Sequence, residues 1–474
     1  MEATSRPVST ALGPSEAGSS APPVPESLEQ TGLSQGFLSD LILRTLYFRG
    51  SRTGEQLERT IKLPFSLLDE QLMRLQQRRL LEVLGTEGRG RLSYVFEITG
   101  EGRTRCREKL STTRYVGPAP VTLEAYREWI LRQKPESLGI DPERVRSGFS
   151  HLVLSEPFLD RLGPAINSGR SIFLYGHAGN GKTTIAETIA EMLGDAMYVP
   201  YAIETGGQVI SVFDPINHRP IEPLEEEPGE RSRWLKPAAT HDARYVLIER
   251  PAVMVGGELT LDDLELRWDE QAGVFLAPPQ MKANGGVFII DDFGRQRVRP
   301  RDLLNRWMVP LERRVDFLSL PMGHHLPVPF ECLLIYATNL DPTELVEEAF
   351  LRRIRYKILV DNPTPEQYRE IFRRCCASRE LEYSPDAVAF IEREYYAEGE
   401  FAPRSCHPRD IVNHLCDLAR YRGVPPRVSE ELIALACKDY FLESPTAEGA
   451  PGAPGGRESA AVGGLAHWGH LYDG

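Results

Sequence analysis

The chain has 474 residues, enough for two to four domains with substantial cores, and a formal net charge of −13, which argues against a protein that coats nucleic acid. Its seven cysteines are odd in number and scattered, which argues against a disulfide framework and indicates a reduced, cytoplasmic protein. Because no apolar run is longer than a strand and the first residues lack a signal-peptide pattern, we expect a soluble protein without a membrane span.

The two ends of the chain have a composition that does not favour a packed core. Residues 1–30 and 444–474 are rich in Ser, Pro, Ala and Gly and contain few large apolar side chains. Such segments bury too little surface to offset the entropy that ordering costs. We therefore expect two disordered tails.

Residues 31–110 have the pattern of a small α+β domain. Apolar residues at helical spacing predict three helices, over 38–48, 53–61 and 67–80, and Ser66 is a good N-cap for the third. Alternating residues predict two strands, 81–84 and 92–98, around a turn-rich loop. This order resembles a winged helix, in which the third helix stands at the recognition position and the loop forms the wing.

The rest of the chain divides into a linker and two larger units. Residues 111–140 predict a linker with one helix near 123–132. Residues 141–362 combine strands and helices as an α/β core does, and they contain a long, partly β-like insertion over 200–284. Residues 363–443 have helical periodicity and almost no β character, which predicts a helical unit.

The most informative stretch is a glycine-rich turn at residues 176–183, which has the spacing of a phosphate-binding P-loop. A short apolar strand precedes it and a periodic helix follows it, so main-chain N–H groups and the positive end of a helix dipole converge there. Lys182 is expected to reach the β- and γ-phosphates of ATP. The expected nucleotide-binding residues are Gly176, His177, Ala178, Gly179, Asn180, Gly181, Lys182, Thr183 and Thr184.

A second buried strand, over 287–290, ends in the two carboxylates of Asp291 and Asp292. After a P-loop, this pattern indicates a Walker B element. Asp291, together with the hydroxyl of Thr183, is expected to bind Mg²⁺, and Asp292 stands where a base polarises the attacking water.

Three further polar positions follow in order. A buried strand over 332–337 ends at Thr338 and Asn339, and parallel sheets place ligands at this end of their strands. Arg352 and Arg353 follow a short helical stretch, and Arg409 lies in the first turn of a predicted helix that starts at His407.

These elements, in this order, resemble the AAA+ ATPases over residues 145–443. The resemblance implies an α/β P-loop core with a parallel sheet and a C-terminal helical lid. It also implies that Asn339 is the sensor-1 residue, that Arg352 or Arg353 is an arginine finger acting on a neighbouring subunit, and that Arg409 is the sensor-2 arginine. A finger in trans implies a homo-oligomer, and rings, often hexamers, are the habit of the family.

Two features depart from the usual AAA+ pattern. Asp292 stands where a glutamate is usual, so the carboxylate is withdrawn by about 1.5 Å, which can slow turnover. The Asp-Asp-Phe-Gly run also resembles helicase loaders of the DnaC and IstB kind.

The second feature is the spacing between Lys182 and Asp291, which are 109 residues apart, farther than a compact core needs. Within the excess, residues 253–257 are expected to form a plain turn rather than a substrate-gripping pore loop, because they contain no aromatic residue.

The segment over 303–330 resembles the MoxR-type arrangement of a helix and a hairpin before sensor 1.

Two functions stay open at this point. In the first, which we favour, an oligomeric Mg²⁺-dependent ATPase remodels a protein client that the winged-helix-like domain docks. In the second, the protein is a DNA-associated ATPase switch that grips duplex DNA through residues 31–110, which hold 14 Lys and Arg against 10 Asp and Glu.

Overall fold

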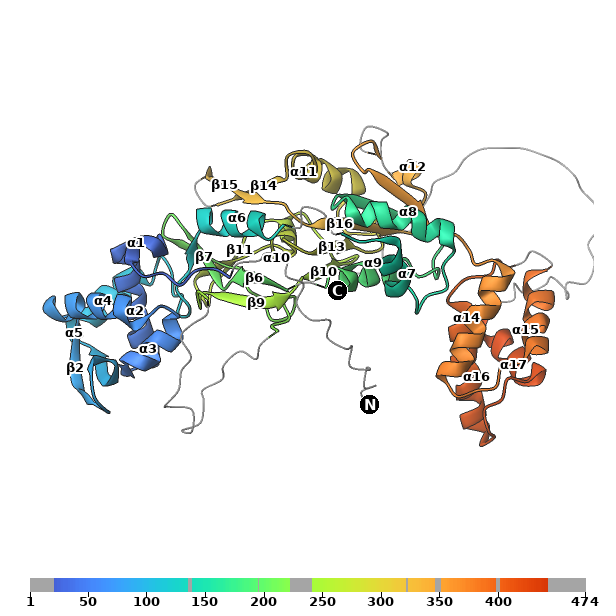
Figure 1. Ribbon diagram of the computed structural model, residues 1–474, viewed down its shortest axis with the longest axis horizontal. Coiled ribbons are helices and arrows are strands. Elements are labelled where there is room, and N and C mark those ends of the chain that lie inside the picture. Colours follow the sequence, from blue (N-terminus) through green and yellow to red (C-terminus); the bar gives the residue numbers. More distant parts are fainter. Residues whose placement is uncertain are drawn as a thin grey trace, which may run out of the picture.

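The computed structural model describes residues 21–134, 139–194, 196–221, 241–320, 323–345, 351–397 and 401–441. They form a row of three units along the long axis of the molecule, with the N-terminal helices at one end and the C-terminal helices at the other (Figure 1). None of the helices in these ranges has the length and hydrophobicity that a membrane-spanning helix requires.

The N-terminal unit has the element order and pairing of a winged helix. Its elements are α1 (Leu28–Thr31), α2 (Gln35–Arg49), β1 (Arg52–Thr53), α3 (Gly54–Ile61), α4 (Phe65–Gln77), β2 (Leu81–Thr86), β3 (Tyr94–Ile98) and α5 (Gly100–Lys109). β3 lies between β1 and β2 in an antiparallel sheet. Leu41, Leu68 and Phe96 are fully buried between the helices and this sheet. The three predicted helices and the hairpin are therefore confirmed.

Two local features of this unit differ from the prediction. α4 begins at Phe65 after Pro64, so Ser66 lies inside the helix and does not cap it. The sequence pattern also does not predict α5, because this helix buries only Gly102 and Cys106 and so carries no apolar period.

Ordered structure also begins earlier than the composition indicates. Pro22 and Pro25 are buried, and the carbonyl oxygen of Pro22 accepts a hydrogen bond from Asp242 N at 2.7 Å. The side chain of Ser27 caps α1. The expectation of disorder is therefore wrong for residues 21–30, because contacts with a distant part of the chain supply the burial that the local composition lacks. Residues 1–20 and the predicted tail 444–474 lie outside the described residues.

The central unit is built on a five-stranded parallel sheet. Its strand order is β10 (Ala252–Val255), β13 (Val287–Ile290), β16 (Leu333–Thr338), β5 (Ser171–Tyr175) and β17 (Tyr356–Leu359). Alternate residues of β5 face opposite sides. Ile172 and Leu174 pack with α8 (Glu156–Asn167) and α9 (Lys182–Met192). These parallel strands confirm the α/β class that the sequence predicts.

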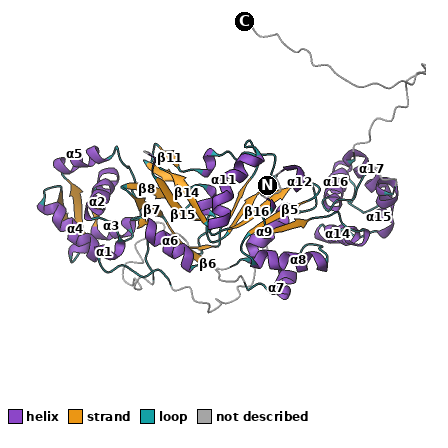
Figure 2. Ribbon diagram, turned by 90° about the horizontal axis from the view of Figure 1, so that it is seen from above, coloured by secondary structure: helices purple, strands orange, loops and turns teal. Residues whose placement is uncertain are grey.

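The opposite face of the sheet is covered by another helix. Phe173 packs there with Trp307 of α11 (Pro300–Arg313), so helices lie on both sides of the strands (Figure 2). Burial on both faces explains why these strands read as continuous apolar runs. α7 (Pro142–Gly148) completes the first face, and the short α12 (Pro342–Leu345) follows β16.

The insertion forms a second β layer beside the parallel sheet. A mixed sheet has the order β11 (Arg267–Asp269), β12 (Val274–Leu276), β8 (Gln208–Ser211), β7 (Ala202–Thr205) and β4 (Val121–Thr122). Next to it lie the pair β6 (Ala196–Pro200) with β9 (Tyr245–Glu249), the short α10 (Pro279–Lys282), and the hairpin β14 (Val315–Ser319) with β15 (His325–Pro329). The helix and hairpin predicted over residues 303–330, before Asn339, are therefore present as α11, β14 and β15.

The predicted linker belongs to this layer. β4 pairs with β7, and α6 (Leu123–Arg132) buries Tyr126, Trp129 and Ile130 in the same core as strands of the insertion. Residues 121–132 are therefore an integral part of the insertion's core, which corrects the linker prediction. The sequence could not indicate this, because a two-residue strand carries no alternation.

The prediction of a turn at residues 253–257 is also wrong for residues 253–255. Val253, Met254 and Val255 lie in β10, the edge strand of the parallel sheet, and only Gly256 and Gly257 lie beyond the strand. β10 pairs in register with β13, whose apolar side chains supply its partners.

The C-terminal unit consists of helices, as the sequence predicts. They are α14 (Pro365–Ser378), α15 (Pro385–Ile391), α16 (His407–Arg422) and α17 (Glu430–Tyr440), which share one apolar core. The described residues of this unit contain no strand. The predicted start of a helix at His407 is confirmed.

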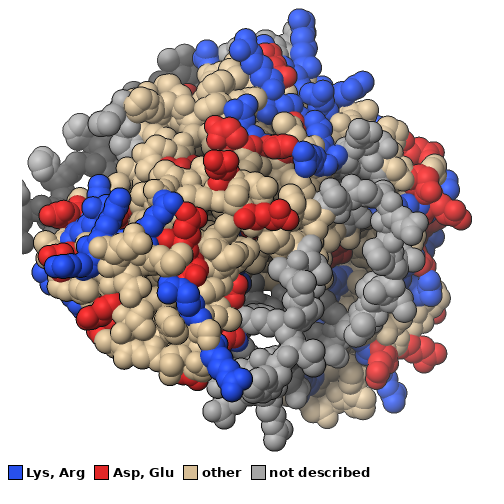
Figure 3. Space-filling view, turned by 60° about the vertical axis from the view of Figure 1, so that its left-hand side comes forward, with Lys and Arg blue, Asp and Glu red and all other residues tan. Residues whose placement is uncertain are grey.

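Both signs of charge are mixed on the surface of the N-terminal unit. Figure 3 turns that end of the molecule toward the viewer and shows Lys and Arg side chains interspersed with Asp and Glu. On α4, Arg74 forms an ion pair with Glu70 at 2.5 Å, and Asp69 forms one with Arg91 at 2.6 Å. The described residues on this face therefore do not make a continuous basic surface.

Candidate active site

The loop between β5 and α9 is built around three glycines with positive φ. Gly176, Gly179 and Gly181 have φ of +136°, +84° and +84°. A Cβ at Gly176 would lie 2.3 Å from the carbonyl oxygen of Val360, and one at Gly179 would lie 2.5 Å from Cys406 Sγ. Only glycine combines this backbone with such close neighbours. The loop can therefore bring main-chain N–H groups close to a phosphate.

Lys182, the first residue of α9, has its ammonium group turned back into this loop. Its Nζ donates to the carbonyl oxygens of Gly176 and His177, both at 2.8 Å, and to Asn339 Oδ1 at 2.6 Å. Burial lowers the pKa of Lys182 to about 8, although the charges of Asp291 and Asp292 act to raise it. The ammonium group therefore already lies in a cage of oxygen atoms of the kind that phosphate oxygens can replace.

The two carboxylates after β13 contact different partners. Asp291 Oδ2 accepts a hydrogen bond from Thr183 Oγ1 at 2.8 Å. Asp292 Oδ1 accepts one from Asn339 Nδ2 at 3.0 Å. β5, β13 and β16 are parallel, so their carboxyl ends bring Lys182, Asp291, Asp292 and Asn339 to one edge of the sheet. The structure thus brings these sequence-predicted residues together.

The donor set fits the Mg²⁺ and the nucleotide that the sequence implies. A carboxylate beside a hydroxyl, 2.8 Å apart at Asp291 and Thr183, is an oxygen pair that a hard cation takes in proteins. α9 begins at a glycine N-cap that offers no side-chain acceptor to the amides of the first turn. Those amides suit an anion.

Gln296 is a member of the site that sequence reasoning missed. Its Nε2 donates to the carbonyl oxygens of Asp291 at 2.8 Å and Asp292 at 3.1 Å, and its Oε1 accepts from Gly294 N at 2.8 Å. The side chain is 9% exposed. Gln296 therefore holds the turn that carries both carboxylates. A buried glutamine soon after an acidic turn carries no periodic signal, so nothing in the sequence pointed to it.

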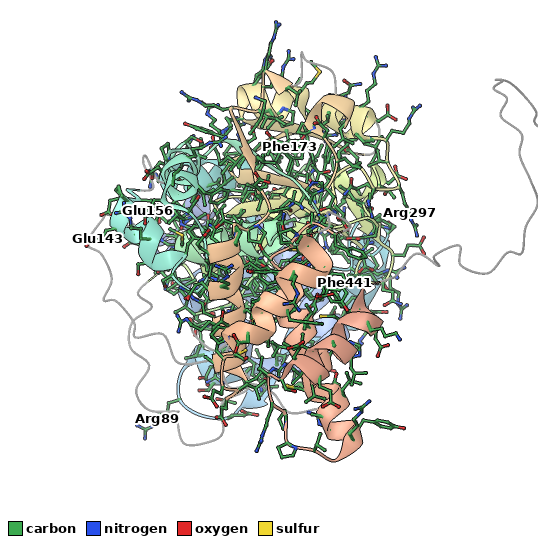
Figure 4. The ribbon with its side chains drawn as sticks, turned by 90° about the vertical axis from the view of Figure 1, so that its right-hand side faces the viewer. Arg89, Glu143, Glu156, Phe173, Arg297 and Phe441 are labelled. Atoms are coloured by element: carbon green, nitrogen blue, oxygen red, sulfur yellow. The ribbon has the colours of Figure 1, made fainter. Side chains whose placement is uncertain are left out.

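The C-terminal unit contacts the P-loop through the segment just before α16. Cys406 N donates to the carbonyl oxygen of Gly179 at 2.8 Å, and Ser405 N donates to Asn180 Oδ1 at 3.2 Å. Asn180 Nδ2 in turn donates to Asn362 Oδ1, after β17, at 2.9 Å. Figure 4 looks onto these helices, with Phe441 labelled among them and Phe173 in the central unit. The P-loop is therefore hydrogen-bonded to the C-terminal unit and also to the segment that follows β17 in the central unit.

Two arginines of the C-terminal unit, Arg409 and Arg404, have different surroundings. Arg409 forms an ion pair with Asp410 at 2.9 Å and its side chain is 67% exposed. Arg404, which the sequence analysis did not select, donates from Nη1 to the carbonyl oxygen of Ala178 at 3.2 Å. Its charge also lowers the pKa of Lys182. Arg404 rather than Arg409 therefore lies against the P-loop.

The two finger candidates differ in their surroundings. Arg353 forms an ion pair with Glu312 of α11 at 2.5 Å. Arg352 lies in the turn before β17 and is exposed. The described geometry thus assigns Arg353 a partner in its own chain.

A parallel five-stranded sheet, a glycine-rich loop at its carboxyl edge and a C-terminal helical unit define the class as an α/β protein with a C-terminal helical unit. A family model described as a domain of unknown function (DUF8689) matches residues 364–439, a range that includes nearly all of α14 to α17. None of the curated proteins matches the sequence.

Solved structures of two proteins match a large part of the chain. NtrX from Brucella abortus in complex with ADP is 16% identical with a TM-score of 0.38, and the match covers 65% of this chain and 59% of that chain. The complex of NtrX with ATP is 15% identical with a TM-score of 0.36, over 66% and 60%. RuvB of Thermotoga maritima, described as a Holliday junction branch migration motor, is 16% identical with a TM-score of 0.33, over 65% and 72%. The chain thus spans about three fifths of the NtrX chain.

Proposed function

We propose that this chain is an AAA+-type ATPase that binds ATP with Mg²⁺ and hydrolyses it. One observation carries the proposal: Lys182, Asn339 and Asp292 form a continuous hydrogen-bonded chain at the carboxyl edge of the sheet, beside the Thr183–Asp291 pair. This set joins the groups that bind a triphosphate to those that activate water.

Each residue has a distinct role in the proposed reaction. Lys182 exchanges the carbonyl oxygens of the loop for phosphate oxygens. Asp292 accepts a proton from the attacking water or polarises it, and Asn339, bonded to Asp292, orients that water. Thr183 and Asp291 would hold Mg²⁺, which offsets the charge of the phosphates when bound. Gln296 keeps the turn of the two carboxylates in place.

The C-terminal unit is proposed to sense the nucleotide. Its contacts with Ala178, Gly179 and Asn180 lie on the loop that a phosphate must enter, so binding at the loop alters these bonds. Arg404 is the stronger candidate for an arginine that acts in cis, and Arg409 is retained as the sequence-based expectation. An arginine in trans requires a neighbouring subunit, so we propose a homo-oligomer. The resemblance to the AAA+ family implies a ring, often a hexamer.

The work that hydrolysis drives is proposed to be the remodelling of a protein client, docked by the winged-helix unit. The mixed charge of that unit supports a protein partner over a duplex. A second candidate, a DNA-associated switch, draws support from the winged-helix order itself and from the exposed Arg78, Arg79 and Arg89. Free cysteines throughout the described residues accord with a cytoplasmic location.

Substitution of Lys182 tests the proposal. Lys182→Ala removes charge-assisted bonds worth about 1.5–3 kcal/mol each, so ATP affinity should fall by about a hundredfold. Arg170→Ala is a matched control, because Arg170 is exposed at the opposite end of β5. Binding of a fluorescent ATP analogue and phosphate release with Mg²⁺ should be lost in the first variant and kept in the second. Unchanged ATP affinity in Lys182→Ala would contradict a nucleotide site at this loop.

A further inference from the structure

A basic segment leads from the turn of the two carboxylates to α11. Residues 294–301, which we call the arginine segment, contain four arginines and no acidic residue. Gln296 and Val298 are buried, whereas the arginines that alternate with them are all exposed: Arg295, Arg297, Arg299 and Arg301. α11 begins at Pro300 without a side-chain cap, and the N-terminus of a helix disfavours positive charge. The stability of α11 therefore does not explain this accumulation of cations.

Two of these arginines are not neutralised by the chain. Within the described residues, the side chains of Arg295 and Arg297 form neither a hydrogen bond nor an ion pair. The acids near them are oriented otherwise. Asp302 pairs with Arg299 at 2.7 Å, and Glu258 accepts a hydrogen bond from a main-chain N–H of its own turn at 2.9 Å. The arginine segment thus has two guanidinium groups that are available to another molecule.

The opposite face of the parallel sheet carries exposed acids. On α7, α8 and α9, exposed acids outnumber exposed arginines by five to three. Each of these arginines is engaged: Arg144 donates to the carbonyl oxygen of Met192 at 2.9 Å, Arg146 pairs with Glu156 at 2.8 Å, and Arg161 donates to a carbonyl oxygen of β17 at 3.1 Å. Four carboxylates, which we call the acidic face, form no hydrogen bond or ion pair with any described residue: Glu143, Asp160, Glu187 and Glu191.

The arginine segment and the acidic face lie on opposite sides of the molecule. α7 and α8 cover one face of the sheet and α11 covers the other (Figure 2). Figure 4 shows Glu143 and Glu156 at one side and Arg297 at the other. Surfaces of opposite charge in this arrangement cannot meet within one chain, but they can meet between copies that lie side by side in the same orientation. Such a head-to-tail contact leaves one surface of each kind free, so it continues into a ring or a filament.

We infer that the arginine segment of one copy binds the acidic face of the next copy. The inference rests on the homo-oligomer of the proposed function and names the surfaces that build it. The guanidinium groups of Arg295 and Arg297 present paired N–H groups that match carboxylate oxygens, which Glu143 and Asp160 supply. Complementary charges of this kind fix the orientation of partners and disfavour like surfaces. The copies therefore associate head to tail rather than face to face.

This contact acts on the active site through Gln296. The residue lies between Arg295 and Arg297 in the sequence, and its side chain donates to the carbonyl oxygens of Asp291 and Asp292. A neighbour that binds the arginine segment therefore also steadies the turn of the two carboxylates. We expect the rate of ATP hydrolysis per subunit to rise as the protein assembles.

Charge reversal on each surface tests the contact in the full chain with ATP and Mg²⁺. Arg295→Glu with Arg297→Glu should weaken association at least about a hundredfold, because like charges then face each other, and Glu143→Arg with Asp160→Arg should do the same. An equal mixture of the two double variants should assemble again, since each reversed surface then meets a reversed partner. Analytical ultracentrifugation measures the association. For the wild type, association should weaken as the salt concentration rises from about 0.05 M to about 0.5 M.

The matched control is Arg420→Glu with Arg422→Glu, which changes the same charge at an exposed end of α16. It should assemble like the wild type, and ATP affinity should be equal in all variants because the P-loop is unchanged. Charge-reversed variants that assemble normally, or a mixture that stays apart, would overturn the inference and leave the proposed ATPase standing. A wild type that hydrolyses ATP as a monomer would overturn both this contact and the oligomer, but not the nucleotide site.

Discussion

At the scale of single residues, Asp292 has an unusual backbone. Its φ is +48°, in the left-handed region, while its carboxylate accepts a hydrogen bond from Asn339. Aspartate and asparagine tolerate this region because a short polar side chain bonds locally, whereas longer side chains adopt it less readily. The short side chain at this position is therefore matched to the turn, and strain stored there accords with a functional role.

This backbone makes Asp292→Asn the cleanest probe of catalysis. Asparagine keeps the left-handed turn and removes the base, so ATP binding should be unchanged while turnover falls by about 10²- to 10⁴-fold. Nucleotide titration and phosphate release measure the two effects separately. Asp302→Asn is the control, because Asp302 lies in the first turn of α11 and pairs there with Arg299. A normal turnover rate in Asp292→Asn would remove Asp292 from the mechanism.

Asp292→Glu separates reach from backbone strain. Glutamate is the usual residue at this position in the AAA+ ATPases that the sequence resembles, but here it must adopt φ of +48°. Left-handed backbone costs on the order of 1–2 kcal/mol for such a residue, so we expect a lower rate and a lower melting temperature than in the wild type. A higher rate with unchanged melting temperature would show instead that the short carboxylate limits hydrolysis.

His407, at the start of α16, is a second residue with a measurable signature. Its Nδ1 lies 2.8 Å from Tyr396 OH, and its ring packs against Tyr440 and Phe441. Burial, helped by the charge of Arg404, lowers the pKa of His407 from 6.5 to about 4. Between these two values the unfolded chain binds a proton that the folded chain does not, so this group makes stability rise with pH.

We therefore expect His407 to make the folded protein sensitive to acid. As the pH falls from about 6.5 toward 4, the melting temperature of the wild type should decrease, and His407→Phe, which keeps an aromatic ring, should reduce that decrease. Scanning calorimetry at pH 7 and pH 5 measures it. His324→Phe, at an exposed histidine, should behave like the wild type. An identical acid response in wild type and His407→Phe would mean that His407 does not titrate in this way.

At the scale of elements, the parts that sequence reasoning found are those with a period or a motif. The apolar runs of β5, β13 and β16 and the glycines of the P-loop are local patterns, and the structure brings their ends together. Arg404 and β4 were missed because their roles depend on contacts with residues far away in the sequence. Gln296 was missed because a single glutamine that bonds to the adjacent turn carries no periodic signal. α5 was missed because it buries two small residues only. Local patterns thus predicted the sheet and its edge, while long-range contacts and elements without a periodic signal could not be predicted in this way.

Two arginines near the loop of the winged-helix unit differ in their availability for DNA. Arg91 is already bonded to Asp69, whereas Arg89 lies exposed at the outer edge of the molecule (Figure 4). We expect duplex DNA to bind only at the non-specific level, about 10⁻⁴–10⁻⁶ M at physiological salt. Arg89→Ala should weaken that binding slightly and Arg91→Ala less, because its charge is neutralised within the chain.

Fluorescence titration of a labelled duplex at two salt concentrations checks this. Nanomolar, salt-sensitive binding that is lost when Arg89 and Arg91 are both changed to Ala would favour the DNA switch over client docking. Absence of binding at low salt would remove the DNA switch altogether.

At the scale of the whole molecule, hydrogen bonds join the three units in series. Arg244, 5% exposed and paired with Asp242, donates to the carbonyl oxygens of Thr31 and Pro120. At the other end, Cys406 and Ser405 bond to the P-loop. The winged-helix unit is thus fastened to the inserted layer, while the C-terminal helices are fastened to the loop that would hold the nucleotide. A change at that loop therefore acts first on the C-terminal unit.

We expect the protein to form an oligomer in which neighbouring subunits complete each other's nucleotide sites. Arg352→Ala should keep ATP binding but lose turnover if Arg352 completes the site of a neighbouring subunit, and Arg353→Ala should act mainly by breaking the pair with Glu312. Mixing Arg352→Ala with Lys182→Ala in equal amounts should then restore activity, because about a quarter of the interfaces in a head-to-tail ring would unite an intact P-loop with an intact arginine. Phosphate release by the mixture, and sedimentation with ATP and Mg²⁺, measure this. A mixture as inactive as its components, or a monomer under saturating nucleotide, would rule out a finger in trans.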